Sequence, residues 1–452
     1  MRNTKSLQNI YYSMPEPLMG LIMNLRALPL VKLRYSRETF KLLDKLMERD
    51  IWTYEKLESY VQEQLQNIID LAKEIPFYRK YAETAQSIKA FPVLIRDMVK
   101  KDYPLIINGR GKNLIKFFTS GSSGSGLPTF YDRDAYVLNW AYGFKHFLWA
   151  GVHPRDWRIS FFGSRIFPTE KKSPPFWMKN HFEHQYFMSI FHISDENAHH
   201  YVNFLSEHQG MILEGFPTVL YLIARYVKAI KGKLTFKVVL STGEPLFPHF
   251  RQEIEEAFGS KAYDSYGMTE WSGLILECEK GGYHALLDCG YLEILRANGE
   301  AADIGEEGYL TWTGFTNKAM PFIRYRIGDK GKWEDHKCTC GRPYPLVKPT
   351  ITRDSDYLIT PDGRLLSPRA VNQVLKDKIS FKACQFVQEN KNEVIIRVVP
   401  DKTKDFRRDL ENAKYALGKI LGQDLLITEK IADEPVRRGT QGKIPLIISK
   451  IL

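Results

Sequence analysis

The spacing of apolar and polar positions predicts alternating helices and buried strands over the first three quarters of the chain. Between residues 36 and 100, charged and apolar side chains recur at helical spacing, and the proline of Ile75-Pro76 interrupts the pattern. A helix rich in aromatic residues is expected over 133–150. Short apolar runs follow at 158–162, 211–213 and 238–241, which is typical of strands covered on both faces. This alternation predicts an α/β domain.

Beyond residue 352 the pattern changes to that of a small α+β domain. We expect a hairpin turning at 361–363, a helix from 367, strands over 383–388 and 393–399, a helix over 406–421 and a strand over 425–429. About 100 residues suffice for a small domain. We therefore predict a large domain over 1–352, mostly helical over 1–100, and a small domain over 353–452.

Residues 15–31 come nearest to a membrane segment. Glu16, Arg26 and three prolines interrupt them, and no small-residue cleavage site follows. The chain has no run of about 18 apolar residues, so we predict no spanning helix. Two interpretations stay open, a helix packed on the protein surface and a helix lying on a membrane surface.

The apolar content, the number of cysteines and the net charge further limit the class of protein. Apolar residues make up 44% and aromatic residues 13% of the chain, which is ample for a large core. Five cysteines in 452 residues do not suggest a disulfide framework and fit a reducing cytoplasm. The formal charge is +11, but the basic residues are scattered and no nucleic-acid motif occurs. We therefore expect anionic substrates such as ATP, and no nucleic acid.

A loop of glycines and hydroxyl residues is the first candidate site. Residues 119–126 read Thr-Ser-Gly-Ser-Ser-Gly-Ser-Gly and follow a mostly apolar run, 114–118. Glycines let backbone N–H groups turn inward and the hydroxyls add donors, a combination suited to phosphate oxygens. No Gly-Lys-Ser/Thr follows, so this is not a Walker loop. A flexible linker is the alternative.

Three later segments favour the phosphate-binding interpretation. Residues 266–270 read Tyr-Gly-Met-Thr-Glu, residues 321–329 read Pro-Phe-Ile-Arg-Tyr-Arg-Ile-Gly-Asp, and residues 442–444 read Gly-Lys-Ile. From about Ile51 to the end, the chain resembles the adenylate-forming superfamily of acyl-CoA synthetases, luciferases and peptide-synthetase adenylation domains. Within it, the chain looks most like phenylacetate–CoA ligase and the capsule-biosynthesis ligases. The resemblance implies a large domain of mixed sheets and helices and a small mobile C-terminal α+β domain.

The resemblance also implies a role for each matching residue. Lys443 would bridge the carboxylate and the α-phosphate during adenylation, a task suited to a compact ammonium group. Thr269 would contact the α-phosphate and Glu270 would help to hold Mg²⁺. Asp329 would accept hydrogen bonds from the ribose hydroxyls. The remaining nucleotide-binding candidates are Thr119, Ser120, Gly121, Ser122, Ser123, Gly124, Gly243, Glu244, Pro245, Tyr266, Gly267 and Arg353.

Each of these residues has an ordinary structural alternative. The Thr-Glu pair at 269–270 can cap a helix, Asp329 can close a turn, and Lys443 can be a surface lysine. The chain also departs from the family pattern at two places. Thr129 stands where family members usually have a lysine, as it does in the phenylacetate–CoA ligase branch. Thr352 and Ser355 alter the junction about which the small domain is expected to rotate.

Four residues form a candidate zinc site. Cys278, His284, Cys338 and Cys340 supply three thiols and an imidazole, the ligand set of a structural tetrahedral zinc. Their spacing is not that of a zinc finger, but some members of the resembling branch carry a similar cluster. Unrelated reduced cysteines are the alternative. Cys289 and Cys384 stand near apolar runs and are expected in the core.

Together these features predict an ATP- and Mg²⁺-dependent ligase that activates a carboxylic acid as an acyl-adenylate. The helix at 133–150 and the segment 214–217 are expected to shape the acid pocket. The expected acceptor is CoA, with a carrier protein or an amino sugar as alternatives, the last giving an amide or ester on a sugar. A further alternative is a non-catalytic nucleotide-binding scaffold. No Ser-His-Asp arrangement is evident, so we do not expect a hydrolase.

Overall fold

A computed structural model describes most of the chain and divides it into two compact units. The described residues are 10–108, 113–119, 127–164, 166–168, 171–350, 357–361, 365–366, 371, 381–400, 405–422, 425–436 and 446–451. The first unit comprises residues 1–117 and 128–351, and the second comprises 118–127 and 352–452.

An eight-stranded sheet forms the centre of the first unit, in the order β11-β10-β9-β8-β7-β4-β6-β5. Strands β9, β8, β7, β4 and β6 are parallel, and β10, β11 and β5 are antiparallel to their neighbours. The strands are β4 (Arg158–Phe161), β5 (Trp177–Asn180), β6 (Gln185–Met188), β7 (Ile212–Gly215), β8 (Val238–Thr242), β9 (Ala262–Gly267), β10 (Leu274–Glu277) and β11 (Tyr283–Ala285). Every residue of β4 and β7 is buried, which confirms the predicted strands covered on both faces.

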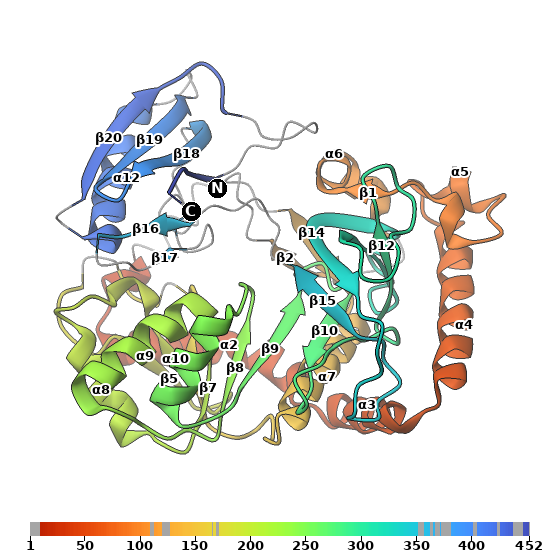
Figure 1. The fold of residues 1–452 in the computed structure, drawn as a ribbon, viewed down its shortest axis with the longest axis horizontal. Helices are drawn as coiled ribbons and strands as arrows, with labels where there is room; N and C mark the ends of the chain where they lie inside the picture. The colour runs from red at the N-terminus through yellow and green to blue at the C-terminus, as the bar shows by residue number, and fades with distance from the viewer. Residues whose placement is uncertain are drawn as a thin grey trace. The chain divides into compact units, whose positions relative to one another are not determined.

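Three helices connect the parallel strands and pack on one another. They are α8 (Ala198–Glu207), α9 (Pro217–Lys231) and α10 (Pro248–Phe258), and they lie in front of the sheet in Figure 1. Pro217 and Pro248 occupy the first turn of α9 and α10, where a missing N–H is tolerated. The observed architecture confirms the predicted mixed α/β fold class.

A second sheet of five strands completes the β structure of the first unit. Its order is β1-β14-β13-β12, with β15 also paired to β14. The strands are β1 (Leu94–Ile95), β12 (Gly290–Leu295), β13 (Gly308–Gly314), β14 (Tyr325–Trp333) and β15 (Val347–Thr350). Trp312 of β13 lies so close to Gly273 that a Cβ there would stand 2.0 Å from the indole ring. A short pair, β2 (Ile115–Phe118) and β3 (Pro128–Tyr131), flanks the predicted phosphate loop.

The N-terminal part is helical, as predicted. Its elements are α2 (Glu16–Arg34), α3 (Arg37–Glu48), η1 (Arg49–Ile51), α4 (Tyr54–Ala72), α5 (Arg79–Ala82), η2 (Ile88–Ala90) and α6 (Arg96–Ile106), and α7 (Arg133–Trp149) follows the predicted loop. Side chains of Ser36, Thr53 and Asp132 cap the starts of α3, α4 and α7. Helix α2 packs one face against α7 and β5, as expected for a helix on the protein surface. Among the helices of the described residues, none is long and apolar enough to cross a membrane.

The second unit has its own sheet and its own core. Strands β18 (Phe381–Asn390), β19 (Glu393–Pro400), β20 (Leu426–Ile431) and β21 (Ile447–Ser449) form a sheet in the order β20-β19-β18-β21, and α12 (Phe406–Leu421) packs on it. The hairpin of β16 (Leu358–Ile359) and β17 (Leu365–Leu366) is present as predicted. Most of its turn, and all but Val371 of the helix expected from residue 367, lie outside the described residues.

Candidate active site and metal cluster

Two predicted nucleotide-binding segments and the predicted acid-pocket segment lie at the ends of three neighbouring parallel strands. Gly215 of β7 pairs with Ser241 of β8, and Thr242 of β8 pairs with Ser265 of β9. Segments 214–217, 243–245 and 266–270 therefore lie at the carboxyl edge of the same sheet. In open α/β sheets, ligands bind at this edge.

Tyr266 and Asp329 link the two sheets of the first unit. Tyr266, in β9, donates its hydroxyl to Asp329 Oδ2 at 3.0 Å, and Asp329 belongs to β14 of the second sheet. Both side chains are half-buried, so each keeps a solvent-accessible surface. The hydrogen bond orients the carboxylate beside the tyrosine ring. Two segments that the sequence separates by 63 positions thus form one polar site.

Glu270 and Thr269 are held by two further tyrosines. Tyr325 donates its hydroxyl to Glu270 Oε1 at 2.9 Å, and the hydroxyl of Tyr131 donates to the Thr269 carbonyl. Glu270 is only 1% exposed. A magnesium ion can therefore reach its carboxylate only if the groups that cover it shift. The carboxylate itself is the kind of oxygen ligand that Mg²⁺ takes.

Glu244 connects two of the strand ends. Its Oε2 accepts the Thr218 hydroxyl at 2.5 Å and the Thr218 N–H at 3.3 Å, at the start of α9. An acidic side chain there satisfies a free backbone donor and the positive end of the helix. Gly243 has φ +82°, which favours glycine, so the turn that places Glu244 depends on this residue. Glu244 thus has a structural role in this arrangement.

The ends of the predicted phosphate loop meet. Thr119 N–H donates to the Leu127 carbonyl at 2.9 Å, and Leu127 N–H donates to Thr119 Oγ1 at 2.9 Å. The Thr119 hydroxyl oxygen therefore accepts at the base of the loop. Ser120, Gly121, Ser122, Ser123, Gly124, Arg353 and Lys443 lie outside the described residues, and their roles stay predictions.

Arg324, directly before β14, has a structural role. Its guanidinium forms two hydrogen bonds to Glu293, at 2.9 and 3.0 Å, and a third to the Phe91 carbonyl at 2.9 Å. The pair is buried, so the two charges neutralise each other out of water. Arg326 instead lies over the ring of Tyr309, with 4.9 Å from its Cζ to the ring centroid.

The four predicted zinc ligands form one cluster. The ligand atoms of Cys278, His284, Cys338 and Cys340 all lie within 4.8 Å of one another. Sγ of Cys278 is 3.6 Å from Sγ of Cys338, and Sγ of Cys340 is 3.3 Å from Nε2 of His284. Around a tetrahedral zinc with bonds of about 2.0–2.3 Å, neighbouring ligand atoms stand roughly 3.5–3.8 Å apart. The donor set and its spacing fit zinc.

The surroundings orient the cluster. His284 Nδ1 lies 2.8 Å from the Tyr344 carbonyl, to which it donates, so Nε2 carries the lone pair that faces the thiols. Gly282 is required for the close approach, because a Cβ there would lie 3.0 Å from Cys338 Sγ and 3.3 Å from His284 Nε2. The hairpin β10–β11 and the loop before β15 meet at this point.

A buried ion pair lies next to the cluster. Lys145 is fully buried and pairs with Asp50 at 2.6 Å, and its Nζ also contacts the Tyr344 hydroxyl at 2.8 Å. Trp149 donates its indole N–H to Asp50 at 2.7 Å, and its ring meets His284 edge-on. These contacts attach the cluster to α7 and η1. Because the charges of Lys145 and Asp50 pair with each other, these contacts stabilise one arrangement of α7, η1 and the cluster.

The sequence interpretation missed several residues that position the site. Tyr131, Thr218 and Tyr325 hold Thr269, Glu244 and Glu270, respectively. Tyr325 lies inside the motif 321–329, so its position in this motif could have indicated a role in the site. Tyr131 and Thr218 carried none, because their partners are 138 and 26 positions away.

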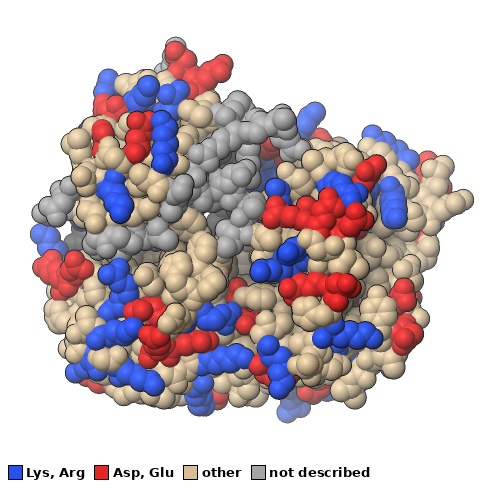
Figure 2. Space-filling view, in the orientation of Figure 1, with Lys and Arg blue, Asp and Glu red and all other residues tan. Residues whose placement is uncertain are grey.

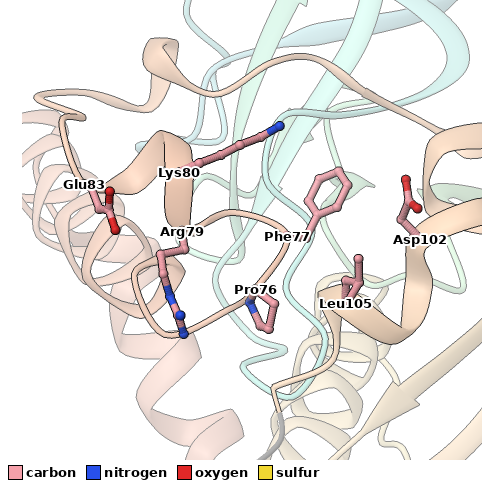
Figure 3. Close-up of a pocket in the computed structure, with 7 residues that line it drawn as sticks. All are labelled: Pro76, Phe77, Arg79, Lys80, Glu83, Asp102 and Leu105. Carbon is pink, nitrogen blue, oxygen red and sulfur yellow. The ribbon is translucent and has the colours of Figure 1, made fainter.

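A separate pocket of about 440 Å³ opens between α5 and α6. Figure 3 shows its lining, which is Pro76, Phe77, Arg79, Lys80, Glu83, Asp102 and Leu105. The pocket is lined by two cations, two carboxylates and apolar groups, so its charge favours neither an anionic nor a cationic ligand. None of the predicted site residues lines it.

Sequence comparison relates the chain to two kinds of protein. Protein CapK of Staphylococcus aureus is 25% identical over 426 residues, 91% of this chain and 92% of CapK. A phenylacetate-coenzyme A ligase of Thermus thermophilus is 29% identical over 187 residues, 38% of this chain and 42% of that ligase. No family model matches the sequence.

Solved structures share the fold. A 2-hydroxyisobutyryl-CoA ligase in complex with 2-HIB-AMP and CoA superposes with a TM-score of 0.59 at 17% identity, covering 89% of this chain and 91% of that one. The same ligase in its postadenylation state gives a TM-score of 0.54 at 18% identity, with the same coverage. The chain thus shares the fold of this CoA ligase, as the motifs predicted, and its sequence relatives are CapK and phenylacetate-coenzyme A ligases.

Proposed function

We propose that the protein is an AMP-forming ligase. It would activate a carboxylic acid with Mg-ATP, release pyrophosphate, and transfer the acyl group from the adenylate to an acceptor. The sequence relatives and the fold support this class of reaction. The observation that carries the proposal is the junction of the two sheets, where Tyr266 orients Asp329 and Tyr325 orients Glu270.

Each residue of this junction has a task in the proposed reaction. Asp329 offers two acceptor oxygens to the ribose diol, and Tyr266 offers its ring to the adenine. Glu270 would hold magnesium, which neutralises charge that develops on the phosphates. Lys443 would place an ammonium between the acid carboxylate and the α-phosphate, where charge develops in the transition state. The acid would lie against α7 and the segment 214–217, at the same sheet edge.

The first half-reaction can be tested without knowing the acceptor. A library of carboxylic acids should contain substrates that release pyrophosphate from ATP and exchange labelled pyrophosphate back into ATP. Lys443→Ala should lower the exchange rate by about 10²–10³-fold, because it removes one preorganised cation. Lys391→Ala, in the hairpin between β18 and β19, should leave the rate unchanged and serves as the matched control. Equal rates for the two variants would contradict the role of Lys443.

CoA is the acceptor that we propose first. Relatives named phenylacetate-coenzyme A ligase and a structural neighbour holding CoA support it. CapK matches over most of both chains, which supports the alternative, an amide or ester on a sugar. Mass spectrometry of products formed with CoA, a carrier protein or amino sugars decides between them. An amide or ester that forms while acyl-CoA does not would replace the CoA proposal.

The scaffold alternative predicts nucleotide binding without turnover. Glu270, Asp329 and Lys443 are all present in the sequence, and a protein that only bound ATP would not need the role in adenylation that we propose for Lys443. The proposal would fail if ATP bound but no acid in a broad library released pyrophosphate.

We further propose that Cys278, His284, Cys338 and Cys340 bind a structural zinc, which would cross-link their two segments when bound. All five cysteines are free thiols, which is compatible with a reducing compartment. The cytoplasm is therefore the location that we propose.

A further inference from the structure

Helix α2 is apolar on two opposite faces, and only one of them packs on the protein. Met19 and Val31 are buried, and Met19 packs in a cluster with Met178. Leu18, Leu21 and Leu25 follow one another at spacings of three and four, which places them on one face. Their exposed fractions are 42%, 54% and 54%. An amphipathic surface helix would have polar residues on this face.

A further exposed apolar side chain lies on a turn that is hydrogen-bonded to α2. Asn24 accepts the His181 N–H at 3.0 Å and donates to the Lys179 carbonyl at 3.0 Å, so the turn after β5 is attached to the helix beside Leu21 and Leu25. This turn carries Phe182, which is 47% exposed. We call Leu18, Leu21, Leu25 and Phe182 the α2 patch. Large exposed apolar groups that gather in one place mark an interaction surface.

The α2 patch has a basic border. Arg26, Lys32 and Lys172 are exposed and form no ion pair with a described residue. The carboxylates nearby are neutralised, because Glu16 pairs with Lys171 and Glu183 pairs with Arg34 at 2.7 Å. The exposed apolar side chains therefore have positively charged neighbours. This combination of charges suits a partner whose surface is apolar in part and also carries anionic groups.

We propose that the α2 patch docks on the surface of an anionic lipid bilayer. Leucines and a phenylalanine would enter the boundary between headgroups and acyl chains, while Arg26, Lys32 and Lys172 would contact lipid phosphates. The helix would lie in the plane of the membrane. Contacts of its opposite face with Met178 and Glu183 hold it to the first unit, so the protein as a whole would be positioned on the bilayer. The proposal does not depend on the identity of the acid or the acceptor.

Vesicle co-sedimentation of the full-length protein tests the proposal. We expect binding to phosphatidylcholine vesicles that contain phosphatidylglycerol, weaker binding to phosphatidylcholine alone, and loss of binding at high salt. Leu21→Gln with Leu25→Gln should lower partitioning by about 10–100-fold. Ile304→Gln, at a residue that is 63% exposed elsewhere, is the control and should not lower it.

The charged border has its own test. Arg26→Gln with Lys32→Gln should lower binding to anionic vesicles by about 25-fold and leave binding to neutral vesicles unchanged. Lys231→Gln with Lys233→Gln removes the same charge at the end of α9, where both lysines are exposed, and should have little effect.

Thermal melts and pyrophosphate exchange show whether the variants fold. Absence of vesicle binding by the folded wild-type protein would overturn the proposal. So would a wild-type dimer that the two leucine substitutions convert to a monomer, since the patch would then be covered by a second copy. Light scattering measures that state directly.

Discussion

At the scale of single residues, the site depends on tyrosine hydroxyls that orient carboxylates. Tyr266 and Asp329 share a hydrogen bond of 3.0 Å, and Tyr325 and Glu270 share one of 2.9 Å. In both pairs the carboxylate is the predicted ligand of nucleotide or magnesium, and the tyrosine fixes its direction. The carboxylates would thus be oriented before the substrate arrives.

Asp329→Asn should raise KM for ATP more than it lowers kcat. The substitution removes a charged acceptor for the ribose, and a hydrogen bond to a charged group contributes about 1.5–3 kcal/mol, or roughly 10–150-fold. Tyr266→Phe keeps the ring and should change KM by less than about tenfold. Steady-state pyrophosphate release at varied ATP measures both effects. Asp335→Asn, at an exposed position after β14, is the control, and an unchanged KM in Asp329→Asn would contradict the ribose role.

His146 gives a pH dependence of stability. It is 6% exposed on α7, and burial lowers its pKa to about 4, below the 6.5 expected in the unfolded chain. The unfolded state therefore binds a proton between pH 6.5 and 4 while the folded state does not. The free energy of unfolding therefore does not depend on His146 titration above pH 6.5, and it decreases as the pH falls from 6.5 toward 4.

His146→Gln should reduce the acid sensitivity of the protein. Between pH 7 and 4, the variant should lose up to about 3 kcal/mol less unfolding free energy than the wild type, on the basis of about 1.4 kcal/mol per pKa unit. Urea unfolding at several pH values measures the difference. His153→Gln removes an exposed histidine and should keep the wild-type slope. Parallel slopes for wild type and His146→Gln would show that His146 titrates normally.

At the scale of elements, the cysteine–histidine cluster joins the β10–β11 hairpin to the loop before β15. Metal analysis of the purified protein should give about one zinc per chain. Cys340→Ser should lose the metal and lower the melting temperature by several degrees, because the two segments lose their link. Pyrophosphate exchange at low temperature should persist, because the ligands are not assigned to catalysis.

Cys384→Ser provides the comparison for metal content. Cys384 packs against the core of the second unit, where burial raises the pKa of its thiol to about 12, so it should keep full zinc. Purified wild-type protein that is metal-free, yet melts at the same temperature with and without added zinc, would rule out a structural zinc.

At the scale of the whole molecule, the second unit has a core of its own. Among its described residues, fourteen buried apolar side chains form one cluster that includes residues of its sheet and of α12, among them Phe386, Leu417 and Ile447. We expect a fragment of residues 353–452 to fold alone and to melt cooperatively. Circular dichroism and amide-proton dispersion test this, and a disordered fragment would contradict it.

A shorter fragment, 353–436, tests the contribution of β21. This strand pairs in parallel with β18, and Leu446 and Ile447 reach the core. Losing these two side chains should cost roughly 3–6 kcal/mol of unfolding free energy. Equal stability of the two fragments would show that β21 does not stabilise the unit.

Local patterns predicted the elements whose stability depends on neighbouring residues in sequence. The helices observed over 133–149 and 406–421 and the strands near 158, 212 and 238 were each predicted within a few residues. Helical periodicity and continuous apolar runs can be recognised within a short stretch of sequence, because they show which side of a helix or strand is buried. Strands β5, β6, β9–β13 and β15 were not predicted, because their burial depends on strands far away in sequence.

The amino-acid sequence was sufficient to predict the fold class, the order of the motifs and the residue types of the candidate sites. Four motifs in order indicated an adenylate-forming ligase, and three thiols with one imidazole indicated zinc. The three-dimensional structure was needed to find that Tyr325 and Tyr131 hold Glu270 and Thr269. It was also needed to find that Glu244 caps α9 and that Leu18, Leu21 and Leu25 face outward. The reason is that hydrogen-bond partners and exposed faces are set by packing between distant segments, and residue type and spacing do not encode which segments meet.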